Sequence, residues 1–327
     1  MKILVTGGAG YIGSHVVKLL GEETKHEIVI ADNLSTGSRE AVLFGRLVEM
    51  ELADFSAVDE LFKKEKFDAV IHFAAKIVVP ESVENPILYY MNNTVNTINI
   101  VKMCVKYNVG KFIFSSTAAV YGEPEVGVVT ENSPTVPINP YGMSKLMSEN
   151  VIRDTALAHI GFKFVILRYF NVAGADPDGK IGQCFPNATH LIKVSCQTAL
   201  GSRDSISVFG TDFNTADGTG VRDYIHVTDL ASAHICALNY LEKGGNSDIF
   251  NCGYGHGSSV FEIIKSVKKV SGHDFLVVMS ERRKGDPALL IADNKKILKT
   301  MNWIPKYQDI DFICKTAYEW EKKLLVK

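Results

Sequence analysis

The sequence predicts an α/β protein in which a doubly wound parallel sheet is followed by a smaller, mixed α/β lobe. Three observations predict this architecture: a glycine-rich turn between a strand and a helix at the start of the chain, a regular alternation of strands and helices up to residue 170, and a change of pattern after Asn171. Such alternation is typical of a parallel sheet covered by helices on both faces. With 327 residues, the chain is long enough for two lobes.

The glycine-rich turn follows a mostly apolar run at residues 2–6, which is typical of a buried parallel strand. Gly8, Gly10 and Gly13 satisfy the G-x-G-x-x-G pattern, and residues 14–20 continue as a helix. In Rossmann-type sheets such glycines allow a tight turn, close approach of a pyrophosphate and close packing of helix on strand. The alternative is a plain glycine-rich turn, but the flanking strand and helix favour a dinucleotide site at the helix start.

A second strand, residues 27–31, ends in Asp32. A carboxylate at this position of a dinucleotide-binding unit grips the ribose hydroxyls of adenosine. Because a 2′-phosphate would meet the negative charge, Asp32 predicts NAD as the cofactor and disfavours NADP.

The following segments continue the alternation. We expect strands at residues 47–52, 68–75, 111–116 and 163–170, and helices at residues 56–64, 86–107 and 141–158. Six strand–helix units in series imply right-handed crossovers and one doubly wound sheet. Ligands then bind outside the carboxyl ends of the strands.

After Asn171 the chain becomes richer in loops. We expect a helix at 188–200, strands at 205–209 and 224–227, and a helix at 228–241 that returns to the first lobe. The expected NAD-binding domain comprises residues 1–171 plus about 222–248, and the expected smaller second lobe comprises mainly about 172–221 plus 249–327. The charged residues Glu319, Glu321, Lys322 and Lys323 in the last helix are interpreted as a solvated face.

The composition narrows the classes of partner. Apolar residues make up 46% and charged residues 22%, as is ordinary for a soluble globular protein. A net charge of −2 gives no reason to expect nucleic acid or an anionic membrane. A strand from residue 2 leaves no room for a signal peptide, and no apolar run approaches membrane-spanning length. Six scattered cysteines without a C-x-x-C pair indicate no metal site and favour the cytoplasm.

Tyr141 and Lys145 are the candidate catalytic pair, because residues four apart on a helix share a face. A phenol titrates at about 10 in water and is a poor base at neutral pH. A nearby cation, or the positive nicotinamide, stabilises the phenolate. Tyr141 could then exchange a proton with an alcohol while hydride moves to the nicotinamide, with Thr117 hydrogen-bonding the reacting hydroxyl. The alternative is a half-buried tyrosine beside a surface lysine.

These features resemble the extended short-chain dehydrogenases/reductases, and within them the UDP-glucose 4-epimerases. The resemblance runs nearly end to end, and its most specific segment is residues 217–227, which is long and rich in unusual residues. The other specific segments are residues 6–15, 32–37 and 167–171.

The resemblance implies roles for individual residues: Tyr141 is the acid/base, Lys145 tunes its pKa and anchors a ribose, and Thr117 stands where many members have serine. The positions that match cofactor contacts are Gly7, Gly10, Tyr11, Ile12, Asp32, Asn33, Asp54, Phe55, Phe73, Ala74, Asn92, Tyr141, Lys145 and Tyr169. The positions that match UDP-hexose contacts are Thr117, Tyr141, Asn171, Arg222, Arg283, Asp286 and Leu290. Arg222 and Arg283 would address the diphosphate, the alternative being surface ion pairs.

The implied activity is reversible epimerisation at C4 of UDP-glucose and UDP-galactose. Tyr141 takes the proton of the 4-hydroxyl while hydride passes from C4 to tightly bound NAD. The resulting 4-ketose then rotates and presents its other face. The hydride and the proton return to that face, which inverts C4. The family also implies a homodimer, in which helices 86–107 and 141–158 pair with their copies.

Several positions depart from the family pattern. Lys76 lies one place before the position where many members carry a lysine, and Ile77 occupies that position. His190 replaces an asparagine, and is either a uracil-side contact or a helix-surface residue. Leu290 stands where tyrosine excludes a 2-acetamido group and a small residue admits it. Leucine at this position predicts that UDP-N-acetylgalactosamine is accepted slowly. The alternative is that Leu290 is an ordinary core residue of its strand.

His72 and His226 lie in strand-like runs, and we interpret both as structural.

Two other functions were weighed. Dehydratases of this family carry an acidic pair after the fifth-strand threonine, where this chain has Ala118 and Ala119. A dinucleotide-sensing binding protein would be expected to lack the Tyr141–Lys145 pair, which is intact. Both alternatives are therefore disfavoured.

Overall fold

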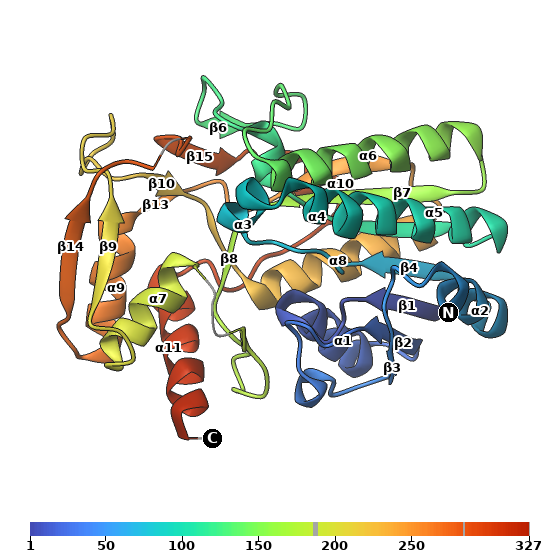
Figure 1. The fold of residues 1–327 in the computed structure, drawn as a ribbon, viewed down its shortest axis with the longest axis horizontal. Helices are drawn as coiled ribbons and strands as arrows, with labels where there is room; N and C mark the ends of the chain where they lie inside the picture. The colour runs from blue at the N-terminus through green and yellow to red at the C-terminus, as the bar shows by residue number, and fades with distance from the viewer. Residues whose placement is uncertain (186–188, 284, 327) are drawn as a thin grey trace.

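The computed structural model describes residues 1–185, 189–283 and 285–326, and its largest element is a seven-stranded sheet in the order β12-β7-β5-β4-β1-β2-β3 (Figure 1). Every neighbouring pair is parallel, which confirms the predicted Rossmann-type sheet. The chain order reverses between β1 and β4, the place where such sheets bind ligands. The strands are β1 (Lys2–Thr6), β2 (Glu27–Asp32), β3 (Arg46–Glu49), β4 (Ala69–His72), β5 (Lys111–Thr117), β7 (Lys163–Tyr169) and β12 (Asp248–Cys252).

Helices cover both faces of this sheet (Figure 1). Side chains alternate along a strand, so Ile3 and Val5 of β1 pack into one buried cluster and Leu4 into another. The first cluster includes α1 (Tyr11–Glu23) and α8 (Val227–Glu242), so α8 does return to the first lobe. The second includes α2 (Phe55–Glu65), α5 (Asn96–Lys106) and α6 (Pro140–Ala158).

The second lobe contains a four-stranded sheet and two ribbons of two strands. The sheet has the order β13-β10-β15-β6, from Ser258–Ser259, Val221–Arg222, Leu289–Ala292 and Val128–Val129. The ribbons pair β8 (Asn171–Ala173) with β11 (Tyr224–His226), and β9 (Ser205–Phe209) with β14 (Leu276–Ser280).

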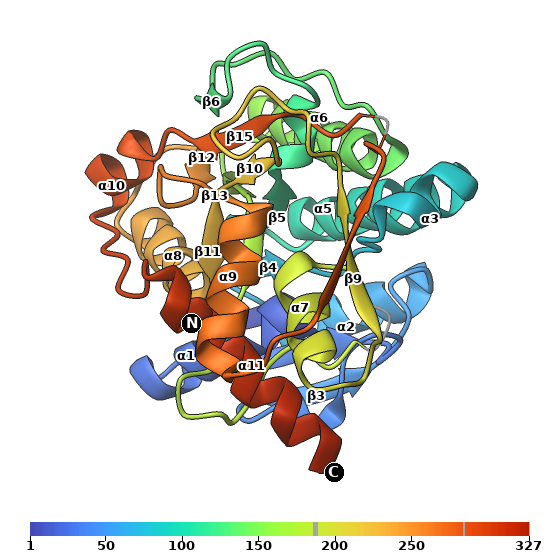
Figure 2. The same ribbon diagram turned by 90° about the vertical axis from the view of Figure 1, so that its left-hand side faces the viewer.

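The helices of the second lobe are α7 (Leu191–Ala199), α9 (Val260–Ser271), α10 (Lys295–Met301) and α11 (Ile310–Val326). Figure 2 shows α7 and α9 beside α11, and all three pack on one another. Short helical turns occupy η1 (Arg39–Ala41) and η3 (Ala118–Tyr121), and α3 (Val79–Glu84) follows β4. None of the described helices is both long and apolar enough to span a membrane.

The structure corrects three expectations. The helix expected at 86–107 is divided into α4 (Pro86–Tyr89), a π-helical turn (Tyr90–Val95) and α5. The expected boundary near residue 248 separates β12 from the first lobe, whereas β12 pairs with β7 at the edge of the large sheet. The helix expected from residue 188 begins at Leu191, and residue 188 lies outside the described part of the chain.

One more correction concerns the end of α11. Trp320 and Glu321 are each only 6% exposed, so this stretch of charged sequence is not a uniformly solvated face. The helix packs against α7 and α9, and Glu321 forms an ion pair with Lys193 of α7. A buried carboxylate needs such a partner, because an isolated buried charge is strongly unfavourable.

Candidate active site

The glycine-rich turn lies where β1, β2 and β4 end. Gly7 has φ +70°, and a β-carbon there would lie 2.6 Å from the backbone nitrogen of Ala74. A β-carbon on Gly13 would lie 2.2 Å from the carbonyl oxygen of Gly7, so only glycine permits this approach of helix to turn. In the described structure no side chain caps the start of α1, and its first turn has no acidic residue. These features suit a bound pyrophosphate.

Asp32 holds the turn from the end of β2. Its Oδ2 accepts from the amide of Ala9 (2.9 Å) and its Oδ1 from the amide of Leu34 (2.8 Å). A carboxylate has about four lone-pair sites, so two backbone bonds leave capacity for ribose hydroxyls. Asp32 is 8% exposed. The residues of the turn and Asp32 thus fit a dinucleotide.

The other cofactor positions divide into two groups. Phe73, Ala74 and Asn92 lie around the turn after β4: Ala74 packs on Gly7, and Asn92 is in the π-helical turn, where it donates to Asn93 (2.9 Å). Asp54 and Phe55 lie at the start of α2, where the Asp54 carboxylate caps the amide of Ala57 (3.0 Å).

Two of the remaining cofactor positions, Asn33 and Tyr11, form side-chain hydrogen bonds. Asn33 donates to Glu51 (3.0 Å), and Phe55 is 47% exposed. The Tyr11 hydroxyl donates to the carbonyl of Gly174 (2.6 Å), which ties the turn to the second lobe. Gly10 and Ile12 lie at the start of α1.

Tyr141 lies in the first turn of α6, which Asn139 caps through the amide of Gly142 (2.8 Å). Its side chain lies beside that of Thr117, the last residue of β5. Burial raises the pKa of Tyr141, and the Thr117 hydroxyl opposes that rise. The structure therefore brings Tyr141 and Thr117 together, as the sequence predicts.

Tyr141 is surrounded by other aromatic side chains. The ring of Tyr89 meets it edge-on at 6.5 Å between centroids. Tyr169 hydrogen-bonds Ser115, and burial raises its pKa, with Tyr141 contributing to that rise. Packing on the ring of Tyr89 restricts where the phenol of Tyr141 can lie.

Lys145 is buried, so the interpretation as a surface lysine is wrong. It is 3% exposed, its ammonium donates to the carbonyl of Ser115 (2.8 Å), and it lies 4.9 Å from the centroid of Phe114. Burial lowers the pKa of Lys145 to about 7, and the negative Glu149 opposes that fall. The Lys145 ammonium is thus held near the end of β5, at Ser115, which is two residues before Thr117.

Sequence reasoning missed Glu149, which is four residues after Lys145 and fully buried. It is paired with Arg168 of β7, whose Nε donates to Glu149 Oε1 (3.0 Å), and it accepts from Ser116. The spacing of Tyr141, Lys145 and Glu149, each four apart, is the signal that would have found it.

Asn93 was missed as well. Its side chain bonds the backbone nitrogen of Lys76 (2.8 Å) and the carbonyl oxygen of Lys76 (3.0 Å), and it donates to Ser144 Oγ (3.0 Å). It therefore fixes the segment after β4 to the helix that carries Tyr141. No local pattern marks such a residue. Lys76 is half-buried and Ile77 is 47% exposed.

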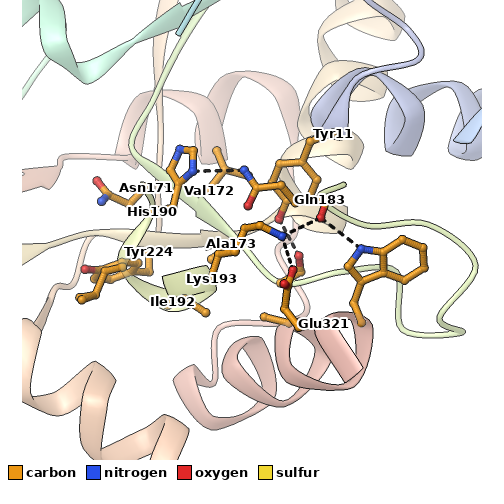
Figure 3. A pocket seen from close by; sticks show the side chains of 14 residues that line it. Tyr11, Asn171, Val172, Ala173, Gln183, His190, Ile192, Lys193, Tyr224 and Glu321 are labelled. Carbon is orange, nitrogen blue, oxygen red and sulfur yellow. Dashed lines mark hydrogen bonds and ion pairs between the residues drawn. The ribbon is translucent and has the colours of Figure 1, made fainter. Parts of the chain in front are cut away.

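The expected substrate residues come from several segments. Asn171 and Tyr224 are paired across the β8–β11 ribbon and line a cavity with Tyr11, His190 and Leu191 (Figure 3). His190 therefore faces the cavity, and its Nδ1 lies 3.1 Å from the Gln183 amide.

The two arginines differ in their surroundings. Arg222 is half-buried, with Asp286 3.9 Å away, and burial lowers its pKa while Asp286 opposes that fall. Arg283 is exposed and stacks 3.7 Å from the ring centroid of Phe209. Leu290 is opposite Arg222 in the β10–β15 pairing and belongs to a buried apolar cluster with Ala118 and others.

His72 and His226 have structural contacts. His72 Nδ1 lies 2.6 Å from Thr6 Oγ1 and its Nε2 lies 3.0 Å from Thr97 Oγ1, and burial lowers its pKa to about 3. His226 Nδ1 accepts from the amide of Thr228 (3.1 Å) and so caps α8. Within the described residues, no group of His, Cys, Asp and Glu is arranged to hold a metal ion.

A parallel sheet that carries a dinucleotide turn, a half-buried tyrosine and a buried lysine at one edge defines a class of nicotinamide-dependent enzymes. The chain belongs to the NAD dependent epimerase/dehydratase family, whose model matches residues 3–253.

Individual relatives match over almost the whole chain. The UDP-glucose 4-epimerase of Azospirillum brasilense is 50% identical over 324 residues, covering 99% of this chain and 92% of the relative. The solved UDP-Glc/GlcNAc 4-epimerase of Campylobacter jejuni is 55% identical with a TM-score of 0.88, over 98% of this chain and 99% of that one. The UDP-glucose 4-epimerase of Brucella ovis, solved in complex with NAD, is 42% identical with a TM-score of 0.94, over 97% of each chain.

Proposed function

We propose that this protein is an isomerase that interconverts UDP-glucose and UDP-galactose at C4 with the help of bound NAD. The observation that carries the proposal is the placement of Tyr141, beside Thr117 and one helical turn before the buried Lys145, at the same sheet edge as the dinucleotide turn. An enzyme that removes a proton and a hydride from one carbinol needs these two groups side by side.

The proton is handled by the chain's own residues. Tyr141 accepts the proton of the sugar 4-hydroxyl, and Thr117 bonds to that hydroxyl and orients it. Lys145 supplies positive charge close to the phenol and favours its ionised form. Bound NAD takes up hydride from C4 and returns it, so none is consumed. After the 4-ketose has rotated to present its opposite face, Tyr141 returns the proton to the oxygen at C4.

The grip on the substrate should be uneven, because the hexose has to turn while the nucleotide stays. We assign the diphosphate to Arg222 and Arg283, whose forked donors suit phosphate oxygens. Arg222 supports this, since one nitrogen donates to the carbonyl of Val221 (2.9 Å) and Asp286 is 3.9 Å from another, so that its five-donor fork keeps capacity for an anion. We assign Asn171 to the same substrate and Asp286 to the orientation of Arg222.

For the cofactor, we assign Asp32 to the adenosine ribose and Gly7, Gly10, Tyr11 and Ile12 to the pyrophosphate turn. A binding titration should therefore favour NAD over NADP. Lys145 and Tyr169 would lie on the nicotinamide side, with Phe73, Ala74 and Asn92 around it. Asn33, Asp54 and Phe55 would lie on the adenine side.

The range of sugars follows from Leu290. The Campylobacter jejuni relative is described as acting on both UDP-Glc and UDP-GlcNAc, which supports acceptance of N-acetylated sugars here. Leu290 packs in a buried cluster next to Ala118, which directly follows Thr117. We propose that UDP-galactose is preferred and UDP-N-acetylgalactosamine is turned over more slowly.

We also propose a cytoplasmic homodimer. Apolar side chains are exposed along α4, the π-helical turn, α5 and α6: Ile87 (74%), Met91 (54%), Ile98 (42%) and Met147 (42%). Pairing these helices with their copies would cover them, and sedimentation analysis of the purified chain would detect the dimer. Cys104, Cys196, Cys236, Cys252 and Cys314 are free thiols, as is usual for a protein of a reducing compartment.

The deciding experiment mixes the purified protein with UDP-galactose and no added NAD. The proposal predicts UDP-glucose as the product. A 4-keto-6-deoxy product would identify a dehydratase, although Ala118 and Ala119 offer no acid for elimination. No product, with NAD bound, would identify a sensing protein.

A further inference from the structure

The buried ion pair between Lys193 and Glu321 is not explained by the chemistry at Tyr141. Lys193 is 5% exposed and Glu321 is 6% exposed, and they join the first turn of α7 to the last turns of α11. A buried pair of this kind can often be replaced by apolar residues without loss of stability. A cation in the first turn of a helix also opposes the helix dipole. Stability alone therefore gives a poor reason for this pair.

The contacts of Lys193 and Glu321 connect this ion pair to the cavity lined by Asn171 and Tyr224. The Lys193 ammonium also donates to the carbonyl of Gln183 (3.1 Å), and Trp320 Nε1 donates to that same carbonyl (3.3 Å). The Gln183 side chain lies 3.1 Å from Nδ1 of His190, the residue directly before α7. Figure 3 shows these bonds converging on Gln183 at one wall of the cavity.

The same cavity contains residues assigned above to the substrate and the cofactor. Asn171 and Tyr224 line it together with His190, and Tyr11 of the dinucleotide turn lines it as well. Gln197 extends the arrangement by donating to the second oxygen of Glu321 (3.3 Å). Both charged partners are thus fully engaged and can fix the wall in one position.

We propose that the Lys193–Glu321 pair is a positioning device for the UDP-sugar site, holding Gln183 and His190 at the wall that faces the nucleotide sugar. The inference rests on the proposed function, because it takes UDP-sugar as the occupant of this cavity. Lys193 and Glu321 are positioning residues that act through Gln183.

The test measures UDP affinity, bound NAD and thermal midpoint in the double variant Lys193→Met/Glu321→Leu, which leaves no unpaired charge. We expect the Kd for UDP to rise about tenfold, the equivalent of one lost hydrogen bond to a charged group. The KM for UDP-galactose should rise with it, while kcat and NAD content stay near the wild-type values. The single variant Lys193→Arg, which keeps the charge and the donors, should retain most of the affinity for UDP.

Trp320→Phe serves as a second variant, since it removes one bond to the Gln183 carbonyl and keeps a ring. Lys269→Met is the matched control, because Lys269 also pairs with α11, through Asp311, but at the surface. A Kd for UDP within about twofold of wild type in the double variant, or in Trp320→Phe if the former does not fold, would overturn the inference. If wild type itself fails to bind UDP, the proposed function fails as well.

Discussion

The half of the site that faces the cofactor and the half that faces the UDP-sugar are built in different ways. In the first, Asp32 and Thr117 stand at the ends of strands of one parallel sheet and Lys145 on a helix beside it, and their polar atoms are already bonded. In the second, Arg222 and Arg283 come from distant loops and short strands. Arg222 donates to the carbonyl of Val221 in its own strand (2.9 Å) and has the Asp286 carboxylate at 3.9 Å, and Arg283 is exposed on the ring of Phe209.

This difference predicts which kinetic constant a substitution in each half should change. Groups held in place before the ligand arrives stabilise a transition state without reorganisation. Groups that gain their partners from the ligand contribute mainly to binding. Changes in the first half should therefore alter kcat, and changes in the second should alter KM.

Tyr141→Phe should have the largest effect. Phenylalanine keeps the ring that packs against Tyr89 but removes the proposed proton acceptor. We expect kcat to fall by ~10²–10⁴, the usual range for general acid–base catalysis. Bound NAD and the circular dichroism spectrum should be unchanged. A kcat within about tenfold of wild type would remove Tyr141 from this role.

Arg222→Leu tests the half of the site that faces the UDP-sugar. The variant should raise the KM for UDP-galactose about 10- to 100-fold, the equivalent of ~1.5–3 kcal/mol of hydrogen bonding to a charged group. Arg282→Leu is the control, since Arg282 pairs with Asp212 at the surface. A large fall in kcat with unchanged KM would break the comparison between the halves.

Lys145→Met should shift the pH dependence. A cation stabilises the phenolate and lowers the phenol's pKa, so losing the cation raises that pKa. The rising limb of kcat against pH should move upward by about 1–3 units. Since burial lowers the pKa of Lys145 itself to about 7, the difference from wild type should be largest below that pH and shrink above it. An unchanged profile would show that Lys145 does not tune Tyr141.

Leu290→Tyr should have the smallest and most selective effect. Overpacking a fixed pocket costs ~1–3 kcal/mol, so turnover of UDP-N-acetylgalactosamine should fall about tenfold or more. Turnover of UDP-galactose should change far less. Equal loss on both substrates would mean that Leu290 supports the buried cluster and does not select the sugar.

The first half of the chain could be predicted closely because its signals are local. The apolar runs of β1, β2 and β5 and the glycine turn need no distant partner to be recognised. The π-helical turn could not be predicted, because it accompanies contacts of Asn93 with Lys76 and Ser144, 17 and 51 residues away. The burial of Glu321 was missed for the same reason, since its partner Lys193 is 128 residues away.

The strand pairings of the second lobe show this limit most clearly. Two-residue strands such as β6 and β10 have too few side chains to produce a period, and β6 pairs with β15 far along the chain. The substrate residues Arg222 and Leu290 meet only through such a pairing. Their positions were therefore indicated by the family resemblance alone.

The central claim is that hydride leaves C4 and returns to the same carbon within one binding event. UDP-galactose carrying deuterium at C4 tests it most directly, with the protein as purified and the product analysed by nuclear magnetic resonance. The account predicts UDP-glucose that keeps its deuterium at C4. Loss of the label to water would contradict it, because inversion would then proceed by removal of a proton from carbon.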